Sequence, residues 1–285
     1  MDKITEVPVA TLNLLGLTIQ INHHIFIMTY IVMGFLTITA ILATRKLRAV
    51  PSHFQSMVEV VFEFIEDITL STLGKKEGPS FVPFIFTIFV FVLAANWIGI
   101  LPHITSVVGF VLAMVHHLFT GNAGEWVVNG ITNTTFIPNM DTVYSVLFQF
   151  PAFQEPTRSI NTDLALGLMV FIVVHVNSLK KHGLMSYFRS YMGDIVPSHG
   201  WWILLFPINP FFYLNLISEL SSVVSHSFRL FGNIFGGFMI LAIVSSLVNH
   251  LLIPVGLLAF FGLFAGIVQA FVFTMLAITY IGQKN

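Results

Sequence analysis

A charged side chain lies inside the apolar stretch Ser218-Glu-Leu-Ser-Ser-Val-Val-Ser-His-Ser-Phe-Arg-Leu-Phe-Gly-Asn-Ile-Phe-Gly-Gly237. From Ile195 to Gln283 the only formally charged residues are Glu219 and Arg229. A guanidinium stays protonated in a protein, so Arg229 cannot escape the cost of burial by losing its proton. An ionised residue in a membrane segment needs a partner, a water-filled cavity or a function. The stretch therefore predicts a membrane helix whose charge serves a purpose.

The composition of the whole chain agrees with a membrane location. Of the 285 residues, 56% are hydrophobic and only 9% are charged, whereas about a quarter of the residues in a soluble domain are charged. Long apolar runs separated by short polar stretches predict an all-α polytopic membrane protein. There is no basic patch of the kind that nucleic acid requires.

Cysteine and the sequence motifs that carry much of enzyme chemistry are missing from the sequence. It contains no cysteine, which excludes disulfides, thiolate metal sites and cysteine nucleophiles. No Gly-rich phosphate loop, metal-spaced histidine cluster or Ser/His/Asp arrangement is present. We expect no metal, no cofactor and no catalytic residue in this chain.

The apolar runs predict about five to six membrane helices in a single membrane domain, 1–285. In chain order we expect an extracytoplasmic tail (1–22), a first span (24–44), an amphipathic cytoplasmic helix (51–74) and a second span (79–102). An extracytoplasmic connection (103–158), a third span (161–179) and a hairpin of two long, strongly tilted helices (201–249 and 252–282) follow. The acidic face of the amphipathic helix indicates a membrane surface or a partner, or simply solvent.

The distribution of Lys and Arg predicts the orientation. Basic residues flank the ends of the first and third connections, whereas the Leu101–Asn161 connection carries only Arg158. The positive-inside rule then places the N-terminus outside and the C-terminus in the cytoplasm.

A stripe of polar and small residues follows the penultimate apolar run. Its members recur at spacings of three and four, which places them on one face of a helix, and they are Glu219, Ser222, His226, Arg229, Asn233 and Gly236. An acid, an imidazole, a guanidinium and an amide in an apolar helix are suited to ion or proton handling. The alternative is a helix joined to its neighbours by interhelical hydrogen bonds.

The last apolar run has a second stripe, formed by Gly262, Gly266, Gln269 and Phe273. The small residues at this spacing favour close helix packing. Gln269 is positioned to face Arg229 across the pair and hold the guanidinium in one orientation. A plain interhelical hydrogen bond is the competing interpretation.

Two motifs in these runs carry a resemblance to a known family. Arg229-Leu-Phe-Gly-Asn233, followed by Gly266-Ile-Val-Gln-Ala-Phe-Val-Phe-Thr-Met-Leu276, resembles subunit a of the F-type ATP synthase. Asn96-Trp-Ile-Gly-Ile-Leu-Pro102 and Lys180-Lys181-His-Gly183 are similar to further family stretches. The resemblance runs from about Pro51 to the C-terminus and leaves the segment 105–154 without a family role.

The resemblance implies a membrane stator subunit that is not itself catalytic, in an energy-transducing membrane, most often the bacterial inner or cell membrane. Its partners would be a ring of c subunits, the peripheral-stalk b subunits and the lipid bilayer. Two aqueous half-channels would lead to the ring carboxylate. The family's arginine, amide and glutamine fall on Arg229, Asn233 and Gln269. The arginine would drive ion release and block a direct leak, and the ion, H⁺ or Na⁺, is left open.

The sequence departs from the family pattern at several half-channel positions. Phe238 and Gly262 occupy the places of a relay pair, and Ser159 replaces an Asp that reappears one turn later as Asp163. We expect Glu219 and His226 to line the cytoplasmic access. Candidates for the other access are Asn161, Asp163, His175 and His250, with Ser159 as a further possible lining residue. For each histidine alone, an interfacial or packing role is the competing reading.

A stand-alone proton-coupled secondary transporter is the alternative function, with the Glu219/Arg229 stripe binding substrate. The lack of an internal repeat and the presence of the two motifs argue against it. A haem-binding cytochrome is a third possibility, but the eleven histidines lack a convincing arrangement on facing helices.

Overall fold

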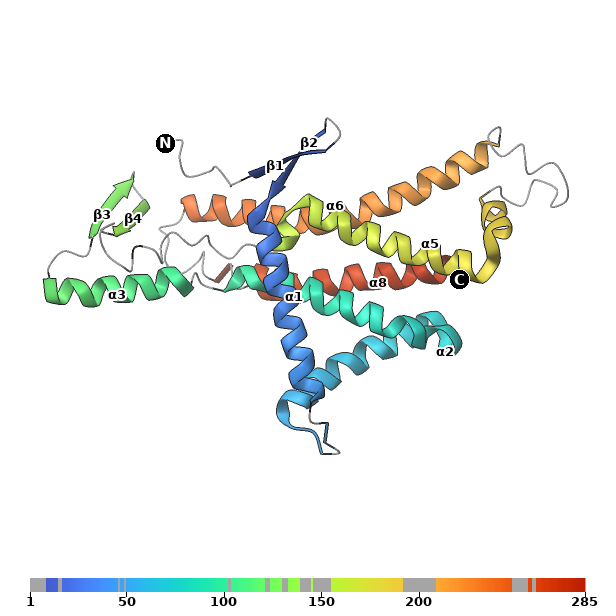
Figure 1. Ribbon diagram of the computed structural model, residues 1–285, viewed down its shortest axis with the longest axis horizontal. Helices are drawn as coiled ribbons and strands as arrows, with labels where there is room; N and C mark the ends of the chain where they lie inside the picture. The colour runs from blue at the N-terminus through green and yellow to red at the C-terminus, as the bar shows by residue number, and fades with distance from the viewer. Residues whose placement is uncertain are drawn as a thin grey trace. The chain divides into compact units, whose positions relative to one another are not determined.

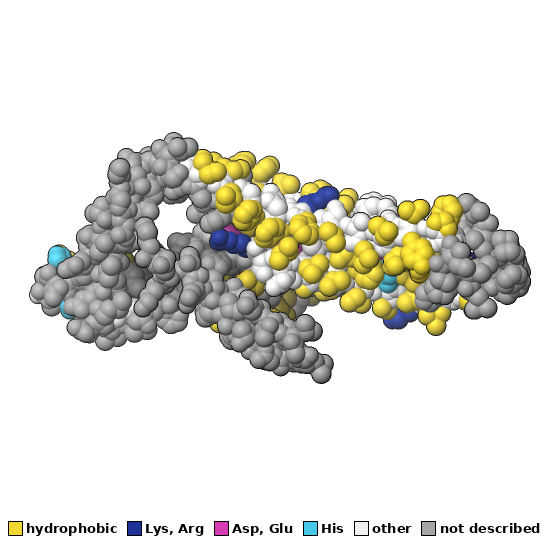
Figure 2. Space-filling model, turned by 90° about the horizontal axis from the view of Figure 1, so that it is seen from above, with side chains coloured by type: hydrophobic (Ala, Val, Ile, Leu, Met, Phe, Trp, Pro, Cys, Tyr) yellow, Lys and Arg dark blue, Asp and Glu magenta, His cyan; other side chains and the backbone are white. Residues whose placement is uncertain are grey.

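The computed structural model describes residues 9–14, 17–45, 47–48, 50–101, 104–120, 124–129, 133–138, 145, 155–191, 209–247, 256–257 and 260–284. Helices dominate these residues, and four of them are long and apolar enough to cross a membrane: His24–Thr44, His53–Ile100, Ile160–Tyr187 and Gly262–Lys284. The chain is a polytopic helical membrane protein, as its composition predicted. Figure 2 shows many hydrophobic side chains, in yellow, on the surface of the described residues. Lipid is the solvent that such a surface requires.

Two compact units make up the chain. Unit 1 contains residues 1–38, 93–156 and 235–267, and unit 2 contains residues 39–92, 157–234 and 268–285. Several helices pass from one unit into the other along the chain.

In unit 1, strands β1 (Val9–Leu14) and β2 (Leu17–Asn22) form an antiparallel hairpin directly before helix α1 (His23–Thr44). A second hairpin, β3 (Gly124–Asn129) with β4 (Asn133–Pro138), follows helix α3 (Ile104–Thr120). Both hairpins lie in segments for which we expected only a tail and a connection. Their β-branched and aromatic residues fit a pleated backbone.

Close packing in unit 1 accounts for one departure from the family pattern. The 3₁₀ turn η1 (Ile98–Ile100) lies beside the π-helical turn η4 (Phe260–Ala265), and the Trp97 indole N–H donates to the Leu263 carbonyl over 3.4 Å. A Cβ added at Gly262 would overlap the Ile100 side chain. The space beside Gly262 is therefore filled by the apolar side chain of Ile100.

Unit 2 is built from most of α2 (His53–Trp97), α5 (Ile160–Ser190), α6 (Pro210–Leu247) and α8 (Gly266–Lys284) (Figure 1). Its core consists of fully buried aliphatic and aromatic side chains from all four helices, among them Ile85, Val170, Leu230, Phe273 and Ile278. Because lipid is as apolar as these side chains, close van der Waals packing, and not transfer from water, holds the helices together here.

Two glycines bend the helices of unit 2. Gly74 in α2 and Gly183 in α5 have φ of 81° and 75°, a left-handed conformation that only glycine adopts without strain. The bend at Gly74 folds α2 back on itself, so that the rings of Phe62 and Phe86 meet edge to face with centroids 5.2 Å apart. The expected helices at 51–74 and 79–102 are thus the two arms of one bent helix.

Helix α5 packs closely against α6 in an antiparallel sense. A Cβ at Gly167 would lie 2.6 Å from the Ser227 hydroxyl and 3.2 Å from the Val223 carbonyl oxygen. Further along α5, His175 approaches Glu219, which lies earlier on α6. Tight backbone approach at a small residue is the usual way in which membrane helices associate.

Candidate functional site

The polar stripe of α6 runs along the border of the helix's buried face. Glu219 is buried and His226 is half-buried, whereas the Arg229 and Asn233 side chains are exposed. A step of three residues falls short of a full turn of 3.6, so the stripe rotates away from the core as it passes from His226 to Arg229. The stripe thus divides into an inward part and an outward part.

Arg229 stands alone among its described neighbours. Its guanidinium makes no hydrogen bond and no ion pair with any residue that the structure describes. Because a guanidinium is always charged, this part of α6 presents an uncompensated positive charge at the surface of unit 2.

One turn further along α6, the Asn233 side-chain amide donates to the Gln269 carbonyl oxygen of α8 over 3.2 Å. The structure therefore has the interhelical hydrogen bond, with Gln269 bonded to Asn233 and not to Arg229. Gln269 is buried, and its own Nε2 has no hydrogen-bond partner within the described part of the chain.

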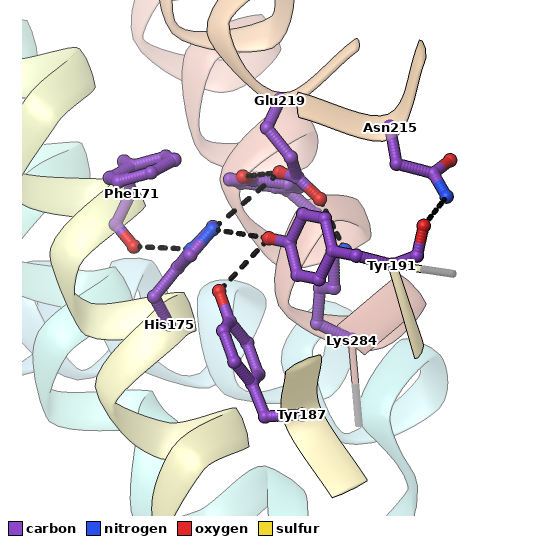
Figure 3. A network of polar contacts seen from close by, with 8 residues as sticks. Phe171, His175, Tyr187, Tyr191, Asn215, Glu219 and Lys284 are labelled. Atoms are coloured by element: carbon purple, nitrogen blue, oxygen red, sulfur yellow. Dashed lines mark hydrogen bonds and ion pairs between the residues drawn. The ribbon is translucent and has the colours of Figure 1, made fainter. Parts of the chain in front are cut away.

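Glu219 forms the centre of a buried polar cluster at the other end of the stripe (Figure 3). The Tyr280 hydroxyl donates to Glu219 Oε2, and Lys284 Nζ pairs with Oε1. The Nε2 atom of His175 lies 3.8 Å from Oε2. The carboxylate is thus held by a cation and a hydroxyl from α8 and approached by an imidazole from α5.

A row of hydroxyls extends this cluster toward the end of α5. The Tyr191 hydroxyl lies 3.1 Å from His175 Nε2 and 2.9 Å from the Tyr187 hydroxyl. Asn215 holds the backbone of Tyr191 by donating to its carbonyl oxygen over 2.9 Å. Burial raises the pKa of the Tyr191 phenol, so this hydroxyl keeps its proton.

His226 lies between the two parts of the stripe. Its Nδ1 donates to the Ser222 carbonyl oxygen over 2.7 Å, and its ring contacts Phe273 and Tyr280. The Nε2 atom is buried and has no hydrogen-bond partner among the described residues.

Asp163 is fully buried near the start of α5, and neither carboxylate oxygen has a hydrogen-bond partner in the described residues. Because α5 and α6 are antiparallel and Gly167 lies against Val223 and Ser227, Asp163, one turn before Gly167, lies at about the level of Leu230. Asn161 is exposed and Ser159 is half-buried. His250 lies outside the described residues.

These features define a class of protein: a polytopic helical membrane protein with an arginine that pairs with no described residue and two groups of polar side chains among three packed helices. The family model for the ATP synthase A chain matches residues 25–282, nearly the whole chain. The chain belongs to this family, that of subunit a of the F-type ATP synthase.

Family membership supplies the general function. The chain is an ion-translocating stator subunit of the F0 part of an ATP synthase, located in an energy-transducing membrane and working with the c ring. The resemblance found in the sequence is confirmed. The roles of individual residues are a separate question.

The sequence analysis missed four members of the Glu219 cluster as site residues: Tyr187, Tyr191, Tyr280 and Lys284. One signal was available for Lys284. It is the first formal charge after Arg229, and a buried carboxylate requires a counter-charge.

Proposed function

We infer that Arg229 is the fixed positive charge that faces the ion-binding carboxylate of the c ring. The proposal rests on one observation: Arg229 is exposed and pairs with no described residue, on a helix made largely of apolar residues. An unpaired charge at this place is costly in a membrane. A passing carboxylate of a ring subunit would compensate it.

The physical consequence is directional ion exchange. A fixed cation favours the ionised form of an approaching carboxylate, which therefore releases its ion. The same charge repels a cation that would pass directly from one half-channel to the other. Moving one charge through the membrane potential is worth about 2.3 kcal/mol per 100 mV, and this energy drives rotation.

Asn233 and Gln269 support the position of this charge. Their hydrogen bond joins α6 to α8 one turn from Arg229, and it limits the rotation of α6 that would turn the guanidinium away from the ring. Their role is to hold the surface that the ring slides along.

We assign Glu219, His226 and His175 to the cytoplasmic access. Glu219 lies ten residues before Arg229, about 15 Å along a helix that rises about 1.5 Å per residue. His175 joins this group, and not the opposite access, because its ring lies beside Glu219.

Asp163 is the leading candidate for the extracytoplasmic access, with Asn161 and Ser159 near it in the chain. A buried carboxyl without a protein partner needs water or a bound cation to satisfy it. Because Asp163 lies at about the level of Leu230, water or a cation bound at Asp163 would lie at nearly the same depth as Arg229. We also propose that the N-terminus lies outside the membrane and the C-terminus in the cytoplasm. The subunit would contact b subunits and lie in a bacterial membrane.

The test of this function is purification from native membranes in mild detergent, followed by reconstitution into liposomes. We expect the chain to co-purify with a c ring and stalk subunits and to support ATP synthesis driven by an ion gradient. A chain that purifies alone and transports a solute would instead be the proton-coupled transporter.

A further inference from the structure

A continuous row of polar side chains leads from the end of α5 to Glu219 (Figure 3). It runs from Tyr187 to Tyr191 over 2.9 Å, to His175 over 3.1 Å, and to the Glu219 carboxylate over 3.8 Å. Tyr187 is half-buried, while Tyr191 and Glu219 are buried. The row therefore has one end nearer to solvent and one end in the core of unit 2.

One arrangement of the protons gives all the hydrogen bonds of this row the same direction. His175 Nδ1 lies 2.9 Å from the Phe171 carbonyl oxygen, and a carbonyl only accepts, so Nδ1 carries the proton. In the neutral imidazole Nε2 is then an acceptor. When Tyr191 donates to Nε2, its single proton is used, and Tyr191 then accepts from Tyr187.

We propose that Tyr187, Tyr191 and His175 form a proton wire that connects the cytoplasmic side to Glu219. The inference rests on the proposed function, which it deepens by naming the relay residues and the transported ion, H⁺. The side chains are already polarised for inward transfer, and each is within contact distance of the next.

Proton transfer along the wire leads from water to Glu219. Water gives a proton to the Tyr187 oxygen as the Tyr187 proton moves to Tyr191, and the Tyr191 proton moves to His175 Nε2. The product is a His175 imidazolium beside the Glu219 carboxylate. Nε2 then gives its proton to Oε2, which restores neutral His175, and the two phenol protons rotate back. ATP synthesis uses the same steps in reverse.

Residues of α8 set the charge balance of the wire. Lys284 pairs with Glu219 and also lies over the Tyr191 ring, 4.7 Å from its centroid, while Tyr280 donates to the carboxylate. The Lys284 cation keeps Glu219 ionised between transfers and opposes a lasting imidazolium at His175. Lys284 and Tyr280 are thus positioning residues. Tyr187, Tyr191, Glu219, Tyr280 and Lys284 are the titratable groups that face His175 in the described structure.

A row of hydroxyls and an imidazole passes protons by exchange of hydrogen bonds, whereas a sodium ion needs several oxygen ligands and room to move. We therefore infer that the ion translocated by this subunit is H⁺ and not Na⁺. It also predicts that single hydroxyls, and not only charged groups, control the rate of translocation.

The test uses the intact ATP synthase in liposomes, with ATP-driven proton uptake and gradient-driven ATP synthesis as readouts. Tyr191→Phe and Tyr187→Phe remove one hydroxyl each and keep the ring, and His175→Ala removes the relay. Tyr213→Phe, on the exposed side of α6, is the matched control. We expect losses of about tenfold for the phenylalanine variants and on the order of 100-fold for His175→Ala, with the control unchanged.

Added imidazole should restore part of the proton uptake of His175→Ala, because it supplies the missing acceptor, and Na⁺ should have no effect on any rate. Wild-type rates in both phenylalanine variants, or sodium-dependent synthesis, would overturn the wire. If Tyr191→Phe fails to assemble, Tyr187→Phe carries the test.

An Arg229→Ala enzyme measured in parallel separates the two proposals. If it is inactive while the tyrosine variants are normal, only the wire is wrong. If it still couples proton flow to ATP synthesis, the proposed role of Arg229 is wrong.

Discussion

Asn233 of α6 and Gln269 of α8 are joined by a hydrogen bond of 3.2 Å between their side-chain amides. Both groups are neutral, so the bond links the helices without the cost of burying a charge. It lies one turn from Arg229, whose guanidinium remains exposed and unpaired among the described residues. The pair therefore fixes the helix face on which the charge is presented.

Asn233→Leu and Gln269→Leu should each lower proton-pumping activity, and the double variant should be no worse than the more severe single variant. The reason is that both remove the same bond, worth about 1–2 kcal/mol in a membrane at most. ATP-driven proton uptake by the reconstituted complex measures this. Independent roles for the two amides would instead make the two losses multiply.

Arg229→Ala should abolish coupled ATP synthesis, with a loss on the order of 100-fold or more, and should raise passive proton leak through F0. Assembly should persist, because Arg229 contacts no described residue through its guanidinium. Subunit composition, ATP synthesis and proton leak are measured together, with the exposed Arg189→Ala as control. Retained synthesis would contradict the role of Arg229.

Lys284→Gln should destabilise the assembled subunit, because it leaves the buried Glu219 carboxylate without its cation. Breaking a buried pair costs about 3–5 kcal/mol, and the partial exposure of Lys284 places the expected cost near the lower value. The midpoint of thermal dissociation of the complex reports it.

Two further variants test the cause of this effect. Lys284→Arg should keep the wild-type midpoint, and adding Glu219→Gln to Lys284→Gln should restore much of it, because no charge is then left unpaired. A midpoint that does not recover in the double variant would argue that the Lys284 stem, and not its charge, stabilises the contact.

Gly167→Val should prevent assembly of the subunit into the complex. Its Cβ would lie 2.6 Å from the Ser227 hydroxyl and 3.2 Å from the Val223 carbonyl oxygen, and the added methyl groups would force α5 and α6 apart. Gly34→Val is the control, because no atom lies within 4 Å of a Cβ at Gly34. The amount of assembled complex in membranes is measured, and equal amounts for both variants would refute close packing at Gly167.

Asp163→Asn should slow ion translocation while the complex remains at least as stable as wild type. The substitution keeps the shape of the side chain and removes a buried carboxyl that no described residue bonds. Reconstituted pumping and the thermal midpoint are the two readouts, and Asp163→Glu should retain more activity than Asp163→Asn. Unchanged pumping in Asp163→Asn would exclude Asp163 from the ion path.

Much of the fold followed from local pattern. The apolar run at 24–44 predicted α1 nearly to the residue, and the motif that contains Arg229 and Asn233 indicated the family from sequence alone. The hairpins β1–β2 and β3–β4 were not predicted, although the alternation of apolar and polar residues in Leu17–Asn22 was an available strand signal. The break in α2 lies at Gly74, where the helix expected at 51–74 ends, although the sequence did not indicate the positive φ of Gly74.

The contacts of the site were harder to predict. For Gln269 the sequence left open an orientation toward Arg229 or a plain interhelical hydrogen bond, and the structure has a hydrogen bond from Asn233. The contact between His175 and Glu219 was not predicted, because it joins two helices that are distant in sequence.

The sequence by itself determined that this is a polytopic membrane protein of the ATP synthase A chain family and that Arg229 is a charge in need of a counter-charge outside its own helix. Only the tertiary structure decided what surrounds Glu219: Tyr280, 61 residues away in the chain, with Lys284 and His175. The physical reason is that helical periodicity fixes which face a residue occupies. Which other helix meets that face, and at what depth, depends on packing between segments distant in sequence.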